Sequence, residues 1–466
     1  MKIEKFDFES TGQFSSLFLD YINKNDSLST FYSNYPDLAG FGKQMELKKD
    51  FGTDKRTLLV KCLQEQYRSI EANDAVRQNI ELLKNDKTFT VTTGHQLNIF
   101  TGPLYFIYKI VTAINTCKQL KSEYPGYNFV PVYWMASEDH DFEEISYFNL
   151  FGNKYTWESD QSGAVGRMDP GSVKAVLDAM PGKNEMFRKA YLEHDTLAAA
   201  VLYYVNELFG YEGLVVIDAD IKELKNIFRQ VVKDELTKSS SFELVNTQTK
   251  LLEEIGYKPQ LRPREINLFY LDENLRERII KEGDLYKVVG NEQQFTEKEI
   301  LKLVDKEPII FSPNVILRPL YQEMILPNLA YIGGPAEVVY WLQLKLMFEY
   351  FQVPFPILLP RNFVLYINHV VARKMDKTGA NTPDVFLNEQ ELIHKLVSNV
   401  AKNGFTVDKE KAKVAGLFAE VHKQVLKLDP TLEKLVMAEA KRAENSLGKI
   451  EKKAVRAIVR QNEDLT

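Results

Sequence analysis

Cysteine is scarce in this sequence. Cys62 and Cys117 are the only two cysteines among 466 residues, and neither belongs to a Cys-x-x-Cys or Cys/His cluster. This scarcity argues against a disulfide framework and a thiolate zinc site, and the histidines show no metal-ligand spacing either. Cys62 lies on an apolar stripe with Leu59 and Leu63, so we expect a buried core thiol and no bound structural metal.

The chain also lacks the apolar segments that mark export or membrane insertion. Its start, MKIEKFDFES, has no apolar core of a signal peptide, and no later stretch is long and apolar enough to span a bilayer. We therefore expect a cytoplasmic protein that makes no membrane contact.

An excess of basic residues is missing as well. The 59 Lys and Arg residues face 65 Asp and Glu residues, which gives a formal net charge of -6. Binding many phosphates requires a basic face, so we expect no nucleic-acid partner. The hydrophobic content of 44% and the length of the chain indicate a packed, enzyme-sized protein.

Apolar runs without clean alternation are present, and helical patterns separate them. KTFTVTTGHQ, FVPVYWMA and GLVVIDAD are strand-like, and the helical segments PLYFIYKIVTAI and IKELKNIFRQVV follow the first and the third of them. In the first of these helices we expect Leu104, Ile107 and Val111 on the apolar face. Such a pattern is typical of a parallel sheet covered on both sides, so we predict a doubly wound α/β fold.

Polar, Gly- and Lys-rich segments interrupt this pattern and predict insertions in the core. We expect N-terminal helices and the first half of the core over residues 1–150, a first insertion over 151–200, core continuation over 201–238, a second insertion over 239–306, the second half of the core over 307–375 and a helical arm over 376–466.

The arm carries the spacing of a coiled coil. Apolar residues alternate steps of four and three at Val436, Ala440, Ala443, Leu447, Ile450, Ala454 and Ala457. Asp429 and Pro430 provide a cap and a first residue for this last helix. Because such a seam needs a partner helix, we predict a homodimer through the arm.

The first candidate site is the loop TTGHQLNIFTGP at the end of a predicted strand. Gly94 permits a tight turn, His95 can donate to a phosphate oxygen, and the amides near Thr101 and Gly102 favour anions at a helix start. The alternative is that these residues form a plain turn followed by an ordinary helix start.

The second candidate site is the acidic cluster SEDHDFEE, which follows another strand. Asp139, His140 and Asp141 could hold an ammonium group, a hydroxyl-rich sugar or Mg²⁺, and His140 could transfer protons. The alternative is structural, because Asp141 and Glu144 have the spacing of a capping pair at a helix start.

The third candidate site lies in NVILRPLYQEMILP and YIGGPAEVVYW. Arg318 suits a carboxylate or phosphate, and Gly333-Gly334-Pro335 makes a turn with open amides before a helix that carries Glu337 in its first turn. Both features also occur in purely structural roles. Likewise, Tyr331, Tyr340 and Trp341 could cover a nucleotide base, although aromatic residues at this spacing are more often core.

Four segments occur in a fixed order over residues from about 88 to 367: TTGHQLNIFTGPLYFIYK, VYWMASEDHDFEEI, SPNVILRPLYQEMILPNLAYIGGPAEVVYW and LLPRNFVLYI. Together they resemble the BshC family of bacillithiol biosynthesis. The resemblance implies a Rossmann-like core related to class I aminoacyl-tRNA synthetases, two connecting insertions and a C-terminal coiled coil that mediates dimerisation. It also implies a reaction that joins L-cysteine to the glucosamine nitrogen of glucosaminyl-malate, with ATP and Mg²⁺.

The resemblance also implies site residues. Nucleotide contacts fall on Gly94, His95, Gln96, Thr101, Gly102, Gly333, Gly334 and Glu337, and catalytic roles fall on His95, Asp139, His140, Asp141 and Arg318. No Lys-Met-Ser-Lys-Ser-like loop is present, and Lys345 or Arg361 could supply its contact with a triphosphate. Because the helical pattern continues to Thr466, we expect a shortened arm.

Three functions are therefore compared. The first is an ATP-dependent ligase that activates the cysteine carboxylate for attack by the sugar amine. The second is an aminoacyl-tRNA synthetase-like enzyme acting on tRNA, which the acidic charge balance disfavours. The third is a nucleotide-binding scaffold protein without ligase activity.

Overall fold

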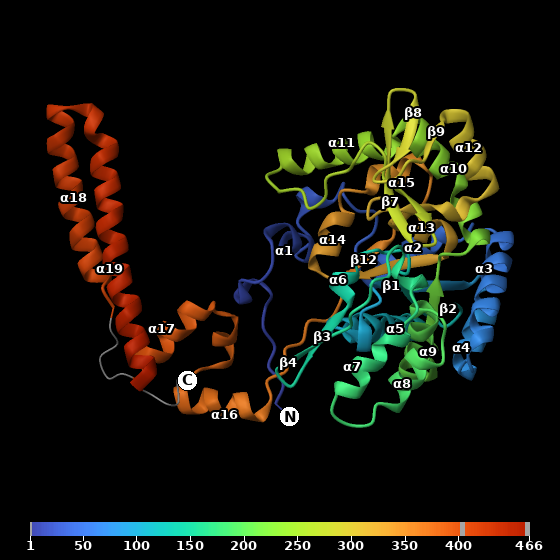
Figure 1. Ribbon diagram of the computed structural model, residues 1–466, viewed down its shortest axis with the longest axis horizontal. Helices are drawn as coiled ribbons and strands as arrows, with labels where there is room; N and C mark the ends of the chain where they lie inside the picture. The colour runs from blue at the N-terminus through green and yellow to red at the C-terminus, as the bar shows by residue number, and fades with distance from the viewer. Residues whose placement is uncertain (1, 401–405, 462–466) are drawn as a thin grey trace. The chain divides into compact units, whose positions relative to one another are not determined.

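The computed structural model describes residues 2–400 and 406–461 (Figure 1). The chain divides into two compact units, Ser15–Phe363 and a second unit formed by Met1–Phe14 with Val364–Thr466. This division falls earlier in the chain than the boundary that the sequence suggested between residues 375 and 376, which lies inside helix α16 (His369–Thr378).

A five-stranded sheet forms the centre of the first unit. Its order is β12 (Ile357–Pro360), β11 (Asn328–Gly333), β1 (Thr88–His95), β2 (Asn128–Met135) and β5 (Val215–Asp218). Every neighbouring pair is parallel, which confirms the predicted doubly wound α/β fold. The strand order reverses at β1 and β11, and ligands of such sheets bind beyond the carboxyl ends at this reversal.

The helices of the first unit lie around this sheet and around the strands of the insertions (Figure 1). They are α1 (Ser16–Ile22), α2 (Leu38–Lys48), α3 (Thr53–Gln66), α4 (Asp74–Leu82), α5 (Tyr105–Glu123), α6 (Phe142–Ile145), α7 (Lys174–Ala179), α8 (Glu185–Leu192), α9 (Leu197–Phe209), α10 (Lys222–Lys238), α11 (Ser240–Glu254), α12 (Glu297–Lys306), α13 (Arg318–Ile325), α14 (Pro335–Trp341) and α15 (Lys345–Tyr350).

Helices α2 and α5 build an apolar core on one face of the sheet. Phe41 and Met45 of α2 and Ala113 of α5 pack there against Phe89 and Val91 of β1. The prediction for α5 placed the apolar face incorrectly, because Leu104 is 54% exposed and the buried face follows Phe106, Lys109, Ile110, Ala113 and Cys117. The apolar pattern of the sequence did not indicate this face, because Lys109 lies on it and a lysine is not expected to be buried.

Both cysteines are buried, as expected for Cys62. Burial raises the pKa of the Cys62 thiol to about 11, and it raises the pKa of Cys117 further. Neither thiol is therefore suited to act as a nucleophile.

Polar side chains set the register in the middle of the sheet. Threonine hydroxyls of β1 donate to the side-chain oxygen of Asn328 on β11, from Thr90 at 3.1 Å and from Thr92 at 2.8 Å. The Asn328 amide in turn donates to Glu323 at 2.6 Å, and Glu323 pairs with the buried Lys48 at 2.9 Å. A threonine-rich strand is thus fully buried because its hydroxyls have partners.

The two insertions have sheets of their own. The hairpin of β3 (Tyr147–Leu150) and β4 (Asn153–Thr156) lies at the first insertion and begins before residue 151, where we expect that insertion to start. The second forms an antiparallel sheet in the order β10 (Phe311–Pro313), β6 (Leu268–Asp272), β7 (Leu275–Glu282), β8 (Leu285–Val288) and β9 (Gln294–Thr296). We had expected the core to resume at residue 307, but β10 pairs with β6 and so belongs to this antiparallel sheet.

The second unit contains α16, α17 (Glu389–Val400), α18 (Asp408–Leu428) and α19 (Glu433–Gln461). Helices α18 and α19 run side by side as a hairpin (Figure 1), so the predicted seam of α19 packs within one chain. Asp429 caps the turn that precedes α19, with its Oδ1 accepting from Thr431 N at 2.8 Å.

The predicted seam is wrong at Ile450, whereas Ala454 and Ala457 are partly buried. Ile450 is 55% exposed, whereas Glu451 and Val455 are buried. A helix with 3.6 residues per turn drifts from a strict repeat of 3.5, so the contact line moves by one residue. The buried Glu451 carboxylate accepts from Lys411 Nζ of α18 at 2.6 Å.

Candidate functional site

Two predicted glycine motifs meet where the strand order reverses. Thr93 of β1 pairs with Ile332 of β11, so Gly94 and His95 end one strand beside Gly333 and Gly334 at the end of the other. A β-carbon at Gly94 would lie 3.2 Å from the Tyr331 hydroxyl, which is tighter than ordinary packing. The structure thus brings these four residues together at the expected ligand position.

A buried ion pair joins the two strand ends. Lys109 of α5 pairs with Glu337 and donates to the Gly94 carbonyl at 2.8 Å. Glu337 also accepts from Gly334 N at 2.8 Å and from the Tyr331 hydroxyl at 2.5 Å. Burial alone would raise the pKa of Glu337, but Lys109 lowers it below its ordinary value. Glu337 therefore fixes the turn, and Lys109 is a site residue that the sequence reasoning missed.

His95 lies between the Tyr105 and Phe106 rings, at centroid distances of 5.3 and 5.4 Å. Burial, reinforced by the charge of Lys109, lowers the pKa of His95 to about 3. Within the described residues its buried Nε2 has no hydrogen-bond partner. His95 is therefore a neutral imidazole with one nitrogen still available to a ligand.

Two arginines lie at the same end of the sheet. The Arg318 guanidinium faces the Trp134 ring at 5.8 Å and the Tyr331 ring at 5.5 Å. Arg361, directly after β12, donates its backbone N–H to Gly333 O at 2.9 Å. Its buried Nε also lacks a hydrogen-bond partner among the described residues. Together with Lys109, the two arginines outnumber the single carboxylate of Glu337, so the strand reversal carries net positive charge.

Of the two residues suggested for a triphosphate contact, only Arg361 lies at these strand ends. Lys345 donates to Thr30 O at 3.0 Å and pairs with Glu349 at 2.9 Å. Tyr331, Tyr340 and Trp341 are buried core residues, so the structural alternative holds for them.

The Thr-Gly-Pro end of the loop differs from the expected helix start. Helix α5 begins at Tyr105, and Gly102 donates its N–H to Ile99 O at 3.0 Å, so this amide is already occupied. Phe100, Thr101 and Gly102 all have positive φ, and a side chain at Gly102 would overlap Asn98. Thr101 and Gly102 therefore determine the backbone path of the loop, and the Gly102 N–H is not available to an anion.

The acidic motif lies at the end of β2 and contacts this loop. Gln96 donates its amide to Asp139 Oδ2 at 3.1 Å and to Glu144 Oε2 at 2.5 Å. Burial alone would raise the pKa of Asp139, but hydrogen bonds from Gln96 and from the backbone N–H of His140, together with the charge of Arg276, outweigh it, so this pKa lies well below its ordinary value. Gln96 therefore connects the glycine loop to the acidic motif.

Asp141 starts helix α6. Its Oδ1 accepts from Glu144 N at 3.3 Å, which is the capping contact that the sequence left open. The Glu144 carboxylate accepts from Gln96 instead of completing a reciprocal capping box.

A second charged cluster, which the sequence reasoning did not identify, lies at the ends of β2 and β5. Glu138 and Asp220 both pair with the buried Lys225, and Asp220 also pairs with Arg167 at 2.7 Å. Ser137 donates its hydroxyl to Asp218 at 2.5 Å. Burial raises the pKa of both Glu138 and Asp218. The only sequence signal was the position of these acids directly after strands.

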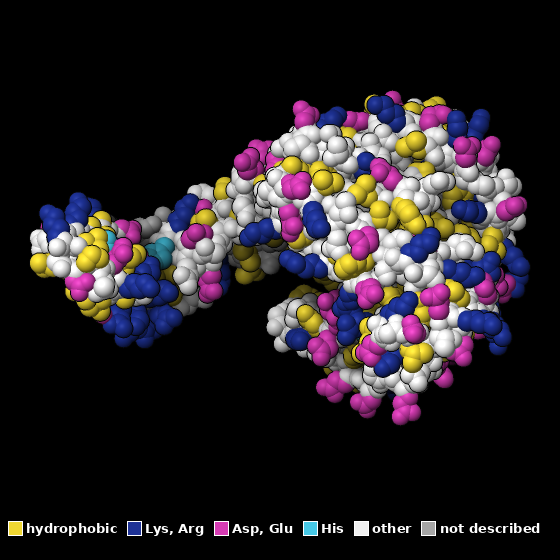
Figure 2. Space-filling model, turned by 90° about the horizontal axis from the view of Figure 1, so that it is seen from above, with side chains coloured by type: hydrophobic (Ala, Val, Ile, Leu, Met, Phe, Trp, Pro, Cys, Tyr) yellow, Lys and Arg dark blue, Asp and Glu magenta, His cyan; other side chains and the backbone are white. Residues whose placement is uncertain are grey.

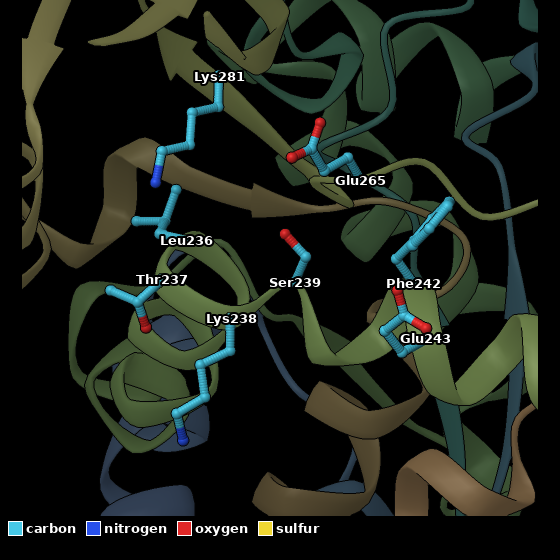
Figure 3. A pocket seen from close by; sticks show the side chains of 8 residues that line it. All are labelled: Leu236, Thr237, Lys238, Ser239, Phe242, Glu243, Glu265 and Lys281. Atoms are coloured by element: carbon cyan, nitrogen blue, oxygen red, sulfur yellow. The ribbon is translucent and has the colours of Figure 1, made fainter. Parts of the chain in front are cut away.

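A hollow of about 430 Å³ lies elsewhere, at the junction of α10 and α11 (Figure 3). Its lining consists of Leu236, Thr237, Lys238, Ser239, Phe242, Glu243, Glu265 and Lys281. None of the predicted site residues contributes to it, and its lysines have acidic partners in Asp234 and Glu297. We therefore assign the candidate site to the strand ends.

Two observations concern metals and membranes. In the parts of the chain that the structure describes, no three His, Cys, Asp or Glu side chains are grouped so as to hold a metal ion. Among the same residues, no helix combines the length and apolar character needed to cross a membrane.

The parallel sheet and its reversal at β1 and β11 define a Rossmann-like protein, and the charged residues at the strand ends form its candidate ligand site. Residues 1–362 match the family model "Bacillithiol biosynthesis BshC, N-terminal Rossmann-like domain", and residues 364–466 match the model of the C-terminal coiled-coil domain. The chain belongs to the BshC family.

Curated relatives agree with this assignment. A protein of Flavobacterium psychrophilum named "Putative cysteine ligase BshC" is 44% identical, over 98% of this chain and 88% of its own length. Relatives with the same name in Flavobacterium johnsoniae and Cytophaga hutchinsonii are 41% and 39% identical, over 100% and 99% of this chain and 89% and 88% of their own lengths.

Proposed function

We propose that this protein is an ATP-dependent ligase that joins the carboxyl group of L-cysteine to the amine of glucosaminyl-malate. The observation that carries the proposal is the pairing, along one sheet edge, of a cationic strand reversal with an acidic neighbouring strand end. The names of the relatives support a cysteine ligase. A biosynthetic ligase of this kind would work in the cytoplasm.

The strand reversal suits the phosphates of ATP. His95 and Arg361 each have a buried nitrogen without a hydrogen-bond partner in the described chain, and Arg318 adds a second guanidinium. The absence of side chains at Gly333 and Gly334 allows close approach to the backbone. ATP would activate the cysteine carboxylate for amide formation, while these residues bind and orient the anionic groups. Mg²⁺ would then be held mainly by the phosphates.

The acidic end suits the amine partners. Asp139 is ionised and largely buried, and it lies beside the exposed His140. A carboxylate held ionised in such a position attracts an ammonium group and can orient the amine for attack on the activated carboxyl. Cysteine and glucosaminyl-malate each provide such an amine.

One reaction tests this proposal. The full-length protein is incubated with ATP, Mg²⁺, L-cysteine and glucosaminyl-malate, and mass spectrometry follows bacillithiol, AMP and ADP. We expect bacillithiol in amounts matching the nucleotide product. AMP would indicate that the cysteine carboxyl is activated as an adenylate, and ADP that it is activated as an acyl phosphate. Tight ATP binding without any amide product would instead indicate a nucleotide-binding scaffold.

A separate measurement tests the alternative of an enzyme that acts on tRNA. Lys and Arg side chains gather on the helical arm, whereas both signs are interspersed over the Rossmann-like unit on the face that Figure 2 shows. An enzyme acting on tRNA would retain nucleic acid during purification, visible in the ratio of absorbance at the nucleic-acid and protein maxima. We expect a protein-like ratio.

We also propose that the protein forms a homodimer through its arm. The hairpin of α18 and α19 leaves large apolar side chains exposed, among them Leu417, Leu435, Met437 and Ile450. Ile450→Lys should shift sedimentation towards the monomer without unfolding the hairpin, because Ile450 lies outside the intrachain seam. An unchanged dimer would exclude this face as the interface.

A further inference from the structure

The antiparallel sheet of the second insertion contributes a residue to the strand-end site. Arg276 of β7 is buried, and its Nη1 lies 2.7 Å from Nδ1 of His140. Its Nε donates to Ser312 Oγ at 3.2 Å, and its guanidinium stacks on the Phe269 ring at 4.0 Å. These contacts from β6 and β10 fix the direction in which the Nη1–H points.

This contact determines which nitrogen of His140 carries the proton. Arginine is always cationic and can only donate, so Nδ1 must accept and the ring proton must lie on Nε2. In the other tautomer Nδ1 would carry the proton, and the nearest acceptor, Asp139 Oδ1, is 3.6 Å away. That Nδ1–H would also meet the N–H of Arg276 Nη1, which lies 2.7 Å from Nδ1, so two donors would face each other. Asp139 Oδ1 already accepts from the backbone N–H of His140 at 2.8 Å.

The other ring nitrogen of His140, Nε2, has no hydrogen-bond partner within residues 2–400 and 406–461, and the side chain is 45% exposed. An Nε2–H in this position is a donor available to a ligand at the end of β2.

We propose that Arg276 is a positioning residue that holds His140 as the Nε2–H tautomer, so that His140 presents a hydrogen-bond donor, not a base, to the substrate. The identity of that substrate rests on the proposed ligase function, in which the donor would meet an oxygen of the carboxyl group being joined. The tautomer itself follows from the contacts of Arg276 alone. The second insertion is therefore part of the site although its sheet is separate from the parallel sheet.

Nitrogen NMR of the full-length protein tests the tautomer directly. The six histidines are labelled with ¹⁵N in their rings, and His140→Gln assigns the signal of His140. In mildly alkaline buffer we expect one neutral pattern, with a protonated Nε2 and an unprotonated Nδ1. A protonated Nδ1, or an equal mixture of both forms, would overturn the proposal.

Substitution of Arg276 tests its role, with Arg278→Gln as the matched control. Arg278 lies on the same strand but is exposed. Arg276→Gln should give a mixture of tautomers and lower kcat about ten- to a hundredfold with little change in KM, because orienting partners of reactive imidazoles have effects of this size. Arg278→Gln should change neither quantity.

Two outcomes separate the inference from the proposed function. An unchanged His140 signal in Arg276→Gln would overturn the positioning role, and Arg276→Lys replaces this variant if the glutamine form does not fold. If the wild-type protein makes no amide product, the ligase proposal fails, whereas the nitrogen spectrum still decides the tautomer.

Discussion

The two ends of one parallel sheet edge carry opposite charge. At the reversal of β1 and β11, Lys109, Arg318 and Arg361 face the single carboxylate of Glu337. At the neighbouring ends of β2 and β5, the acids outnumber the bases: Glu138, Asp139, Asp218 and Asp220 lie near Lys225, Arg167 and Arg276.

The two ends also differ in how their polar groups are satisfied. At the reversal, nitrogens of His95 and Arg361 remain buried without hydrogen-bond partners in the described chain. At the acidic end, Glu138 Oε1 and Asp220 Oδ1 also lack hydrogen-bond partners among the described residues, but both carboxylates form ion pairs with Lys225. A buried donor without a partner costs stability unless a ligand meets it, so we expect the cationic end to be the one that binds an anion. The acidic end would then bind the amine that attacks.

Breaking the ion pair at the reversal should have the largest effect. Lys109→Met leaves the Glu337 carboxylate, whose side chain is 23% exposed, without its cation. Removal of one partner from a fully buried pair costs about 3 to 5 kcal/mol, and because Glu337 is only partly buried we expect a loss of about 2 to 3 kcal/mol. Urea unfolding measures this loss. Lys118→Met on the same helix is the matched control, since Lys118 is 59% exposed in its pair with Glu212 and should cost less than about 1 kcal/mol. Equal losses would show that the reversal does not depend on Lys109.

Much of the fold follows from the sequence because its signals are local. The strands β1, β2 and β5 and the helices α5 and α10 are confirmed, since each apolar run or helical period is contained in one segment. The antiparallel sheet around β7 was not predicted, because most of its strands are only three to five residues long, and because β10 pairs with β6 across the intervening β7, β8, β9 and α12.

The site was predictable only in part for the same reason. Gly94, His95, Asp139 and Gly333 were found because each lies at or shortly after the end of an apolar strand. Lys109 and Arg276 were missed because each lies inside an element, and only the tertiary fold brings it to the strand ends. A buried lysine or arginine gives no sequence signal beyond its own charge.

Neutralising the acidic end at one position should have the next largest effect, on catalysis. Asp139→Asn keeps the shape of the side chain but removes the charge proposed to attract the amine, so ligase activity should fall about a hundredfold or more while the protein stays folded. Asp141→Asn is the control, because asparagine caps helix α6 nearly as well as aspartate. Near-wild-type activity of Asp139→Asn with saturating ATP and cysteine would exclude the acidic motif from the active site.

Removing the imidazole at the cationic end should have a smaller effect, on nucleotide binding. His95→Ala deletes one hydrogen bond to a charged group, which is worth about 1.5 to 3 kcal/mol, so ATP affinity should fall about ten- to a hundredfold. Calorimetric titration at mildly alkaline pH measures this, with His194→Ala as control, because the His194 ring bonds to Ala190 O of the preceding helix α8. Unchanged affinity would exclude a phosphate contact by His95.

The smallest effect concerns the pH dependence of stability. It tests whether His95 at the cationic end is shielded from water, as its lowered pKa indicates. The pKa of His95 is about 3 in the folded protein because burial and Lys109 oppose its protonation, whereas an unfolded histidine has a pKa near 6.5. Between these values the unfolded chain binds a proton that the folded chain does not. The free energy of unfolding should therefore fall as the pH drops below about 6.5, by up to about 1.4 kcal/mol per pH unit from this residue. His95→Gln does not titrate, so its urea midpoint should decline less than that of the wild type between pH 7 and pH 5. Parallel curves would mean that His95 titrates as it does in water, and the reversal would then be an open, solvated turn instead of a site built for an anion.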